Sequence, residues 1–215
     1  MIRLGAGRPD RIAAVGAHCD DIAIGAGGTL LTLCQAHPGI RVDALVLSGA
    51  GGEREQEERA ALAAFCPGAD LRPTVRGLPD GRLPAHWAEA KAAVEELRGR
   101  IEPELVLAPR TDDAHQDHRG LARLVTTAFR DHLVLGYEIA KWDGDLGRPV
   151  AYQPLSPETA ERKARLLEEH YPSQHHRPWY DREAFLGLAR IRGIECHERY
   201  AEAFAVTKLT LNLGG

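Results

Sequence analysis

Short apolar runs alternate with longer amphipathic stretches through most of the chain, and Gly, Pro and Asp stand at the junctions. Apolar runs of roughly four to eight residues are typical of strands, whereas apolar residues spaced three and four positions apart are typical of helices. The runs predict strands at residues 12–17, 42–48, 71–76, 105–108 and 133–138. The amphipathic stretches predict helices at residues 25–35, 53–65, 88–100, 119–130 and 157–169.

Strands that alternate with helices are typical of an α/β fold, in which helices cover both faces of a mostly parallel sheet. Residues 182–192 are predicted to form a further helix, and the alternation over residues 203–211 predicts an edge strand. Two stretches, 142–149 and 171–179, are irregular, and such segments in a compact domain are often functional loops or lids. We expect one domain over residues 1–215.

Composition narrows the class of protein. The 215 residues are 44% hydrophobic and 27% charged, with a formal net charge of −4, which suits a globular domain with a sizeable core. No basic run stands out, which argues against a nucleic-acid partner. No signal peptide is evident, and no stretch approaches the ~20 apolar residues of a membrane span, so we expect a cytoplasmic protein. The four cysteines lack CxxC spacing, which favours buried free thiols. The sequence leaves open whether the protein forms a homo-oligomer.

Two polar clusters follow predicted strands, at the position where α/β sheets usually carry their active sites. The first is HCDD at residues 18–21, and the second is HQDH at residues 115–118. Together they supply two imidazoles and one carboxylate for a metal, and a further carboxylate and imidazole for chemistry. That ligand number leaves open positions on a divalent ion, which is typical of a catalytic zinc site rather than a closed structural one.

The spacing within each cluster suggests a division of roles. His18 and Asp21 lie three positions apart at a strand-to-helix turn, so both can converge on one point while Asp20 faces elsewhere in the same cleft. His115 and His118 have the same spacing, so one can bind a metal while the other faces the substrate.

This arrangement suits metal-assisted hydrolysis. Zinc lowers the pKa of a bound water from about 16 to about 7, and Asp20 is the candidate base that removes the proton. The imidazole of His115 is a candidate to stabilise the oxyanion or to protonate the leaving group, and Asp117 is expected to orient or charge-stabilise it.

The double motif resembles the LmbE/PIG-L family of zinc-dependent N-acetylglucosaminyl deacetylases, whose motifs are usually written AHPDD and HPDH. Further similarities are Arg54 with Glu57 on the second helix, Asp113 before the second cluster, and Lys163 before the Ser-Gln pair at residues 173–174. The resemblance covers most of the chain. It is carried by the two motifs together, since either alone would be a weak sign.

The resemblance implies a Rossmann-like three-layer sandwich and a zinc-dependent N-deacetylase. The expected activity is hydrolysis of the acetyl group of an N-acetylated sugar of the GlcNAc type, or of a sugar conjugate. It implies that zinc, or another divalent metal, is held by His18, Asp21 and His118, with Asp20 as general base and His115 assisting the oxyanion or the leaving amine.

The chain departs from the family pattern at three positions. Cys19 and Gln116 each replace a proline, and Ile22 stands where an acidic residue is frequent. Loss of a proline relaxes a turn but removes no ligand, so we expect catalysis to survive while the substrate subclass is less defined. Although zinc accepts sulfur, the position of Cys19 favours a packed side chain.

Several residues have a second interpretation. Arg54 either binds the substrate or belongs to a solvated helix face, and Asp113 either contacts a sugar hydroxyl or caps the following helix. The metal residues as a group could form a polar capping cluster, and Asp20 could be only a hydrogen-bond partner. The His pair at 175–176 is expected in a loop, and the glycines at 25, 27 and 28 are expected to allow close packing or substrate approach rather than dinucleotide binding.

Two other functions are compatible with the same residues. A non-haem Fe(II) oxygenase also uses two histidines and one carboxylate, although that site is typically carried by a β jelly roll. A sugar-binding homologue without turnover would not require both Asp20 and His115.

Overall fold

The computed structural model describes residues 7–210 and arranges seven strands in one sheet, in the order β3-β2-β1-β4-β5-β7-β6. The strands are β1 (Arg11–Gly16), β2 (Arg41–Val46), β3 (Asp70–Val75), β4 (Leu105–Pro109), β5 (Leu133–Tyr137), β6 (Ala151–Leu155) and β7 (Tyr200–Val206). The strands β1 to β5 pair in parallel, and β7 runs antiparallel to both β5 and β6. The predicted α/β fold with a mostly parallel sheet is therefore confirmed.

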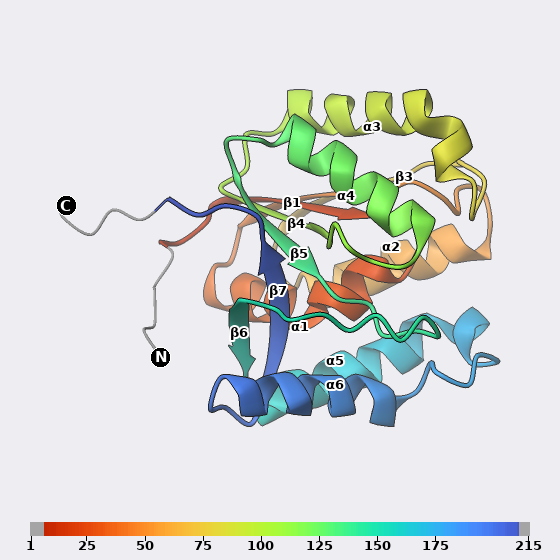
Figure 1. Ribbon diagram of the computed structural model, residues 1–215. Helices are drawn as coiled ribbons and strands as arrows, with labels where there is room; N and C mark the ends of the chain where they lie inside the picture. The colour runs from red at the N-terminus through yellow and green to blue at the C-terminus, as the bar shows by residue number, and fades with distance from the viewer. Residues whose placement is uncertain (1–6, 211–215) are drawn as a thin grey trace.

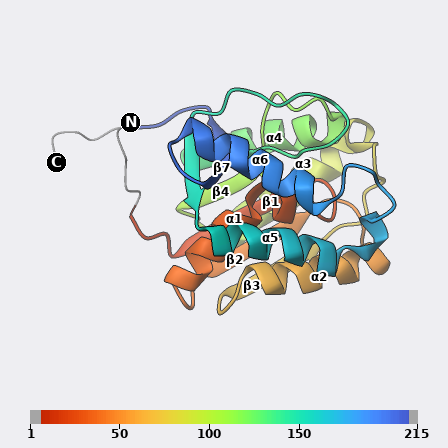
Figure 2. The same ribbon diagram turned by 90° about the horizontal axis from the view of Figure 1, so that it is seen from below.

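Helices cover both faces of the sheet (Figure 1). One face carries α1 (Asp21–Ala36), α2 (Glu53–Phe65), α5 (Pro157–His170) and α6 (Arg182–Glu195), and the other carries α3 (Trp87–Arg100) and α4 (Gln116–Ala128). Figure 2 looks onto the first group, with α5 and α6 nearest the viewer. Two short 3-10 helices, η1 (Leu83–His86) and η2 (Pro172–Gln174), lie in the connections.

The two faces of β1 follow from the period-two alternation of its side chains. Ile12 and Ala14 belong to the core beneath α1 and α2, whereas Ala13 and Val15 belong to the core beneath α3 and α4. All four are 0% exposed, because β1 is a central strand covered on both sides. Burial on both faces explains why this strand has an almost continuous apolar sequence.

The glycines at the start of α1 bring this helix close to its neighbours. A Cβ at Gly25 would collide with the ring of Tyr137, and one at Gly27 would lie 2.6 Å from Phe65 Cε1. These glycines thus serve close packing.

The helix α1 is also tied to the C-terminal part of the chain, because Lys163 Nζ donates to Ile24 O and to Glu202 Oε1, each at 2.6 Å.

The structure differs from the sequence-based elements at α1, β7 and β6. The helix α1 begins at Asp21, four residues before the predicted start at residue 25. The strand predicted at residues 203–211 is β7, which begins at Tyr200 and lies between β5 and β6 rather than at the edge; residue 211 lies outside the described residues. The edge strand next to β7 is β6, which was not predicted because its sequence AYQPL contains a proline and lacks a regular alternation.

The strand order brings the two motifs together. In this order β1 and β4 are neighbours, with Ile12 opposite Leu105, although they lie about ninety positions apart in the sequence. The chain leaves β1 toward α1 and β2 on one side and returns at β4 on the other, which creates the switch point where ligands of such sheets usually bind. HCDD lies just after the end of β1, and HQDH follows β4 after the short loop of residues 110–114.

Candidate active site

The three predicted metal ligands place their donor atoms at the spacing that one ion requires. His18 Nδ1 lies 3.1 Å from His118 Nε2. The Asp21 carboxylate completes the group, with Oδ1 at 3.3 Å from His118 Nε2 and Oδ2 at 3.6 Å from His18 Nδ1. Ligand atoms at the corners of a zinc tetrahedron with bonds of about 2.0–2.1 Å are about 3.3 Å apart. Each histidine nitrogen thus has an Asp21 oxygen near this spacing, Oδ1 for His118 and Oδ2 for His18, so the three side chains are candidates to hold a zinc-sized ion.

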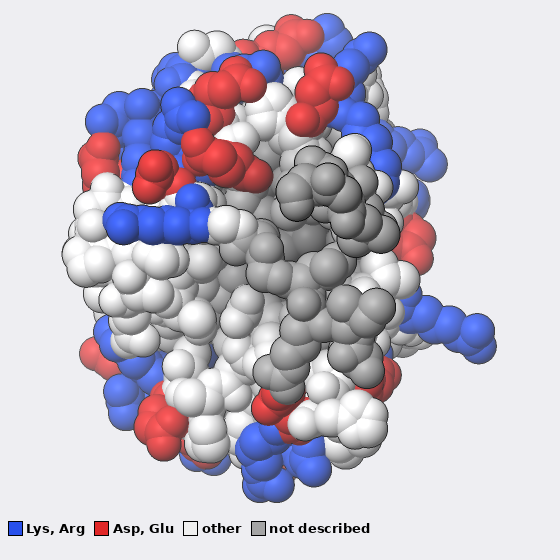
Figure 3. Space-filling model, turned by 90° about the vertical axis from the view of Figure 1, so that its left-hand side faces the viewer, with Lys and Arg blue, Asp and Glu red and all other residues white. Residues whose placement is uncertain are grey.

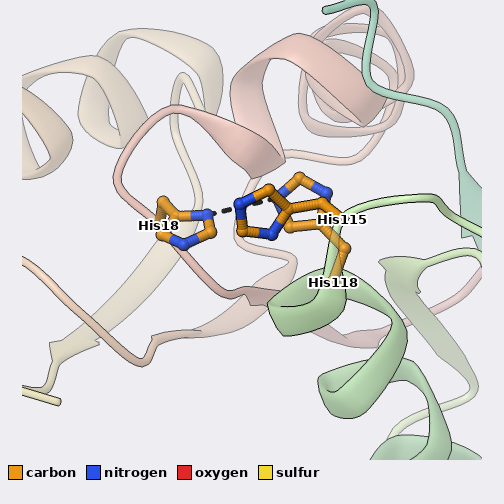
Figure 4. Close-up of side chains that lie close together, drawn as sticks. All are labelled: His18, His115 and His118. Atoms are coloured by element: carbon orange, nitrogen blue, oxygen red, sulfur yellow. Dashed lines mark hydrogen bonds between the residues drawn. The ribbon is translucent and has the colours of Figure 1, made fainter. Parts of the chain in front are cut away.

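Local structure sets this geometry. His18 follows β1, and Asp21 begins α1 with its Oδ2 accepting the backbone N–H groups of Ala17 at 2.8 Å and His18 at 2.9 Å. His118 lies in the first turn of α4, so the two imidazoles approach from opposite sides of the cleft (Figure 4).

Each imidazole turns its second nitrogen toward carboxylates. His118 Nδ1 lies 3.2 Å from Asp113 Oδ2, and His18 Nε2 lies 3.3 Å from Asp117 Oδ2 and 3.0 Å from Asp80 Oδ1. Metal-binding histidines usually direct their other ring nitrogen to a carboxylate in this way, which selects the tautomer that leaves the ligating nitrogen free.

The carboxylates favour positive charge at this point of the cleft. Burial by itself lowers the pKa of both histidines, but the carboxylates outweigh it. Hydrogen bonds to Asp117 and Asp21 raise the pKa of His18 to about 12, and the charge of Asp21 together with a contact to Asp113 raises that of His118 to about 9. Burial raises the pKa of Asp21, yet the charge of His118 holds it well below its usual value. The same field suits a metal cation, which competes with protons for these nitrogens.

His115 is the N-cap of α4, and its ring lies beside the two other imidazoles, with ring centroids 4.9 Å from His18 and 4.6 Å from His118 (Figure 4). Its Nδ1 accepts the backbone N–H of Asp117 at 3.2 Å, so the hydrogen of the neutral ring sits on Nε2. Burial, and then the charges of His118 and His18, lower the pKa of His115. A neutral ring with an Nε2–H donor results.

The nitrogen atoms of these three imidazoles also form a group that could hold an ion, and a second group of this kind consists of His18, Asp80 and Asp117. Asp117 contacts His115 through its backbone N–H, and the charge of its carboxylate acts to raise the pKa of that imidazole, so its expected role toward His115 stays a prediction. The carboxylate also accepts Leu83 N–H at 3.1 Å and approaches His18. The reason is its place as the second residue of α4, where the side chain faces the turn before η1.

Asp20 lines the same cavity as the histidines but has different partners from Asp21. Arg54 Nη2 donates to its Oδ2 at 2.9 Å, and its backbone N–H donates to Glu58 Oε2 at 2.8 Å. Burial and the charge of Asp21 raise the pKa of Asp20, Arg54 lowers it, and the result is about 6. The backbone of Asp20 has φ 106°, a left-handed value that is uncommon for a residue other than glycine.

Arg54 and Asp113, the two predicted substrate-binding residues, have different places relative to the cavity. Besides Asp20, Arg54 contacts Glu57 at 3.0 Å and Ser173 Oγ at 3.1 Å, so it belongs to the cavity wall rather than to a solvated helix face. Asp113 is 1% exposed and accepts the N–H of His115 at 2.7 Å. Asp113 does not line the cavity, and it lies next to His118, one of the predicted metal ligands. Its contact with a sugar hydroxyl stays a prediction.

Cys19 points away from the ligand atoms. Its thiol donates to Ser48 O at 3.4 Å and packs against Gly49, where a Cβ would lie 2.6 Å from the sulfur. Burial, together with the charge of Glu58, raises its pKa, so the thiolate that a metal would require is disfavoured.

A family model described as PIG-L: GlcNAc-PI de-N-acetylase matches residues 13–129, which include both motifs. The chain belongs to the PIG-L family. The match spans β1 to the end of α4 and thus contains every side chain predicted to bind metal or to act in catalysis.

Three solved structures show how this PIG-L chain relates to others. It is 26% identical to the conserved protein TT1542 from Thermus thermophilus, with a TM-score of 0.72, covering 94% of this chain and 96% of that one. It shares 19% identity with the N,N'-diacetylchitobiose deacetylase of Pyrococcus horikoshii (TM-score 0.70, 93% and 84% covered). It shares 16% with GalB, the 4-carboxy-2-hydroxymuconate hydratase of Pseudomonas putida KT2440 (TM-score 0.74, 95% and 99% covered). At these last two identities the likeness shows the fold alone.

The C-terminal third of this PIG-L chain completes the cavity, and most of these residues were missed by sequence reasoning. The cavity has a volume of about 380 Å³. Both irregular loops singled out from the sequence reach it, the first with Trp142 and Asp143 and the second with Gln174, Arg177 and Trp179. The irregular composition of these two loops was the only sign in the sequence that they take part in a site. Which of their residues reach the cavity depends on contacts between distant segments, and such contacts leave no regular spacing in the sequence.

One face of the molecule shows how the charged side chains are distributed outside the cavity. On the face seen in Figure 3, described lysines and arginines stand beside acidic side chains and form no continuous basic surface there. Within residues 7–210, no helix has both the length and the apolar character needed to cross a membrane.

Proposed function

We propose that the chain is a metal-dependent hydrolase that removes the acetyl group from an N-acetylated sugar of the GlcNAc type, or from a sugar conjugate. The observation that carries the proposal is the convergence of His18 Nδ1, His118 Nε2 and the Asp21 carboxylate within 3.1 to 3.6 Å of one another, in the cavity that Asp20 also lines. The family description and the deacetylase among the solved structures of the same fold support it.

A divalent ion held by His18, Asp21 and His118 would lower the pKa of water in the cavity and polarise the acetamido carbonyl. Zinc suits the two imidazoles and one carboxylate, although other divalent ions accept the same donors. Asp20 takes a proton from the attacking water as the oxygen of that water bonds to the carbonyl carbon. Arg54 holds the Asp20 carboxylate at 2.9 Å, so this base needs little reorganisation.

His115 stabilises the negative charge that develops on the carbonyl oxygen. Its Nδ1 is engaged by the Asp117 N–H, so its Nε2–H is the donor available to the substrate. The proton taken by Asp20 then passes to the leaving nitrogen as the C–N bond breaks. The products are acetate and a free amine, and the base returns to its starting form.

The test combines metal analysis with turnover. Purified protein is expected to contain about one metal ion per chain and to release acetate from an N-acetylhexosamine-type substrate. Asp20→Asn should retain the metal and lose turnover, whereas His118→Ala should lose both. Asp131→Asn, an exposed carboxylate outside the cavity, is the matched control and should behave as wild type.

The same experiment separates the alternatives. Full acetate release by metal-free protein would contradict the proposal. Oxygen uptake by the Fe(II)-loaded protein would favour the oxygenase, although the parallel sheet here differs from the jelly roll typical of that class. Sugar binding without turnover, by a protein loaded with metal, would favour the non-catalytic homologue.

A further inference from the structure

The cavity contains an arginine whose side chain forms no hydrogen bond or ion pair with the described part of the protein. Among residues 7–210, the lysines and arginines that line the cavity are Arg54, Lys141 and Arg177. Arg54 is paired with Asp20 and Glu57, and Lys141 Nζ lies 3.0 Å from an oxygen of Asp113. By contrast, the Arg177 side chain has no hydrogen bond or ion pair with any described residue, and its Nε is buried without a partner.

The segment that carries Arg177 is held in place. The backbone N–H of Arg177 donates to Gln174 O at 2.9 Å, and its carbonyl accepts the N–H of Tyr180 at 3.0 Å. On one side Ser173 is anchored to Glu57 by its N–H at 2.8 Å and its hydroxyl at 2.6 Å. On the other side Tyr180 OH donates to Leu167 O at 3.0 Å. The guanidinium is therefore presented by an ordered loop.

Asp80 is a carboxylate of the same cavity on which the charge of Arg177 acts. The charge of Arg177 reaches the Asp80 carboxylate, but the two form no ion pair, and Asp80 Oδ1 is instead 3.0 Å from His18 Nε2. A buried guanidinium N–H without an acceptor is unfavourable by about 1–3 kcal/mol or more. A ligand oxygen at this position would remove that penalty.

Flat aromatic surfaces adjoin the same part of the cavity. Trp142 from the first irregular loop is 65% exposed and meets Trp179 edge to face, with ring centroids 6.5 Å apart. Trp179 Nε1 is also buried without a partner among the described residues. A planar guanidinium in a cavity that two indole rings also line suits a ligand that carries both a flat sugar or ring face and a carboxylate or phosphate, since the guanidinium fork matches two oxygens of such a group.

We propose that Arg177 binds an oxyanion carried by the substrate, so that this protein acts on acidic N-acetylated sugars in preference to neutral ones. The inference rests on the proposed function, because it assigns the substrate class of the same cavity. Carboxylate and phosphate share the recognised chemistry, and the Trp142 and Trp179 rings contact the part of the substrate that connects the anion to the acetamido group.

The experiment compares neutral and acidic substrates of one sugar type. Acetate release is measured for N-acetylglucosamine, N-acetylglucosamine 6-phosphate and N-acetylmuramic acid, and the ratio of acidic to neutral kcat/KM is the readout. Wild type is expected to prefer at least one acid by about tenfold or more, and the preferred acid identifies phosphate or carboxylate as the group bound. Arg177→Gln should reduce this ratio by about tenfold, mainly through KM, and Arg177→Lys should reduce it less.

Arg182→Gln is the matched control, because Arg182 lies five positions away, pairs with Glu161 and does not line the cavity. Its ratio should equal that of wild type. An unchanged ratio in Arg177→Gln, an equal fall in Arg182→Gln, or no preference of wild type for either acid would overturn the inference.

A binding arm separates this inference from the proposed function. Calorimetric titration with glucosamine 6-phosphate and with glucosamine needs no turnover. Tighter binding of the phosphate that is lost in Arg177→Gln, in a protein that releases no acetate, would support the anion site and contradict the deacetylase. Acetate release from the neutral and acidic sugars at equal efficiency would support the deacetylase and contradict the anion site.

Discussion

Glu58 Oε2 accepts the backbone N–H of Asp20 at 2.8 Å, at a residue whose φ is 106°. Left-handed backbone at a residue with a Cβ is unfavourable by roughly 1–3 kcal/mol, so the surrounding contacts must hold it. Glu58 is 0% exposed and is itself held by Tyr171 OH at 2.7 Å. A contact between α2 and the β1–α1 turn thus positions the candidate base, while Asp21 next to it faces His18 and His118.

We expect Glu58→Ala to reduce kcat by about ten- to a hundredfold with a smaller change in KM, because the Asp20 N–H loses its buried acceptor and the base loses its alignment. Glu58→Gln retains an oxygen acceptor and should lose less. The metal content, measured in the same preparations, should equal that of wild type in both variants. A loss confined to KM, or a loss of metal, would show that Glu58 does not act by positioning Asp20.

Glu58 also predicts a pH dependence of stability. Burial raises its pKa from 4.5 to about 7, although Tyr171 and the Asp20 N–H act in the opposite direction. Between these values the folded protein binds a proton that the unfolded chain has released, so this group makes folding less favourable as pH rises from about 4.5 to 7. Glu58→Gln lacks the effect. Its free energy of unfolding relative to wild type, from urea titrations at pH 5 and pH 7.5, should therefore increase with pH, and a constant difference would contradict the assignment.

Asp113 is expected to control metal affinity without touching the metal. Its Oδ2 lies 3.2 Å from His118 Nδ1, and removal of such a carboxylate partner typically weakens metal binding by about 10–100-fold. Asp113→Asn keeps the shape of the side chain, and competition with a chromophoric chelator measures the affinity. Asp131→Asn on the surface is the control. Equal affinities for all three proteins would exclude this role.

The buried pair of Lys163 and Glu202 should be important for stability. Glu202 accepts the N–H groups of Gly28 and Thr29, each at 2.7 Å, as well as Lys163 Nζ at 2.6 Å. Lys163→Met leaves a buried carboxylate without its counter-charge, which is expected to lower the free energy of unfolding by about 3–5 kcal/mol in a urea titration.

The double variant Lys163→Met, Glu202→Gln is expected to lose less than the sum of the two single changes, because each single change already removes the ion pair. Strict additivity would indicate that the two residues do not interact.

Much of the fold was predictable from local pattern. The apolar runs at β1 and β4 are almost continuous because helices cover both faces of these strands. Such a run consists of consecutive residues, so it can be recognised from the sequence alone. The edge strand β6 was not predictable in the same way. Its five residues include Pro154 and are only partly buried, and their pairing with β7 involves residues nearly fifty positions away.

The same distinction holds for the site. The sequence by itself determined the donor groups and their grouping, because HCDD and HQDH place them at the ends of two strands within single turns of chain. Only the tertiary structure decided that the Asp117 carboxylate meets His18, that Glu58 holds Asp20, and that Arg177 Nε is buried without a hydrogen-bond partner among the described residues. The physical reason is that spacing along the chain describes which groups one turn can bring together, whereas these contacts depend on packing between segments that the fold alone makes neighbours.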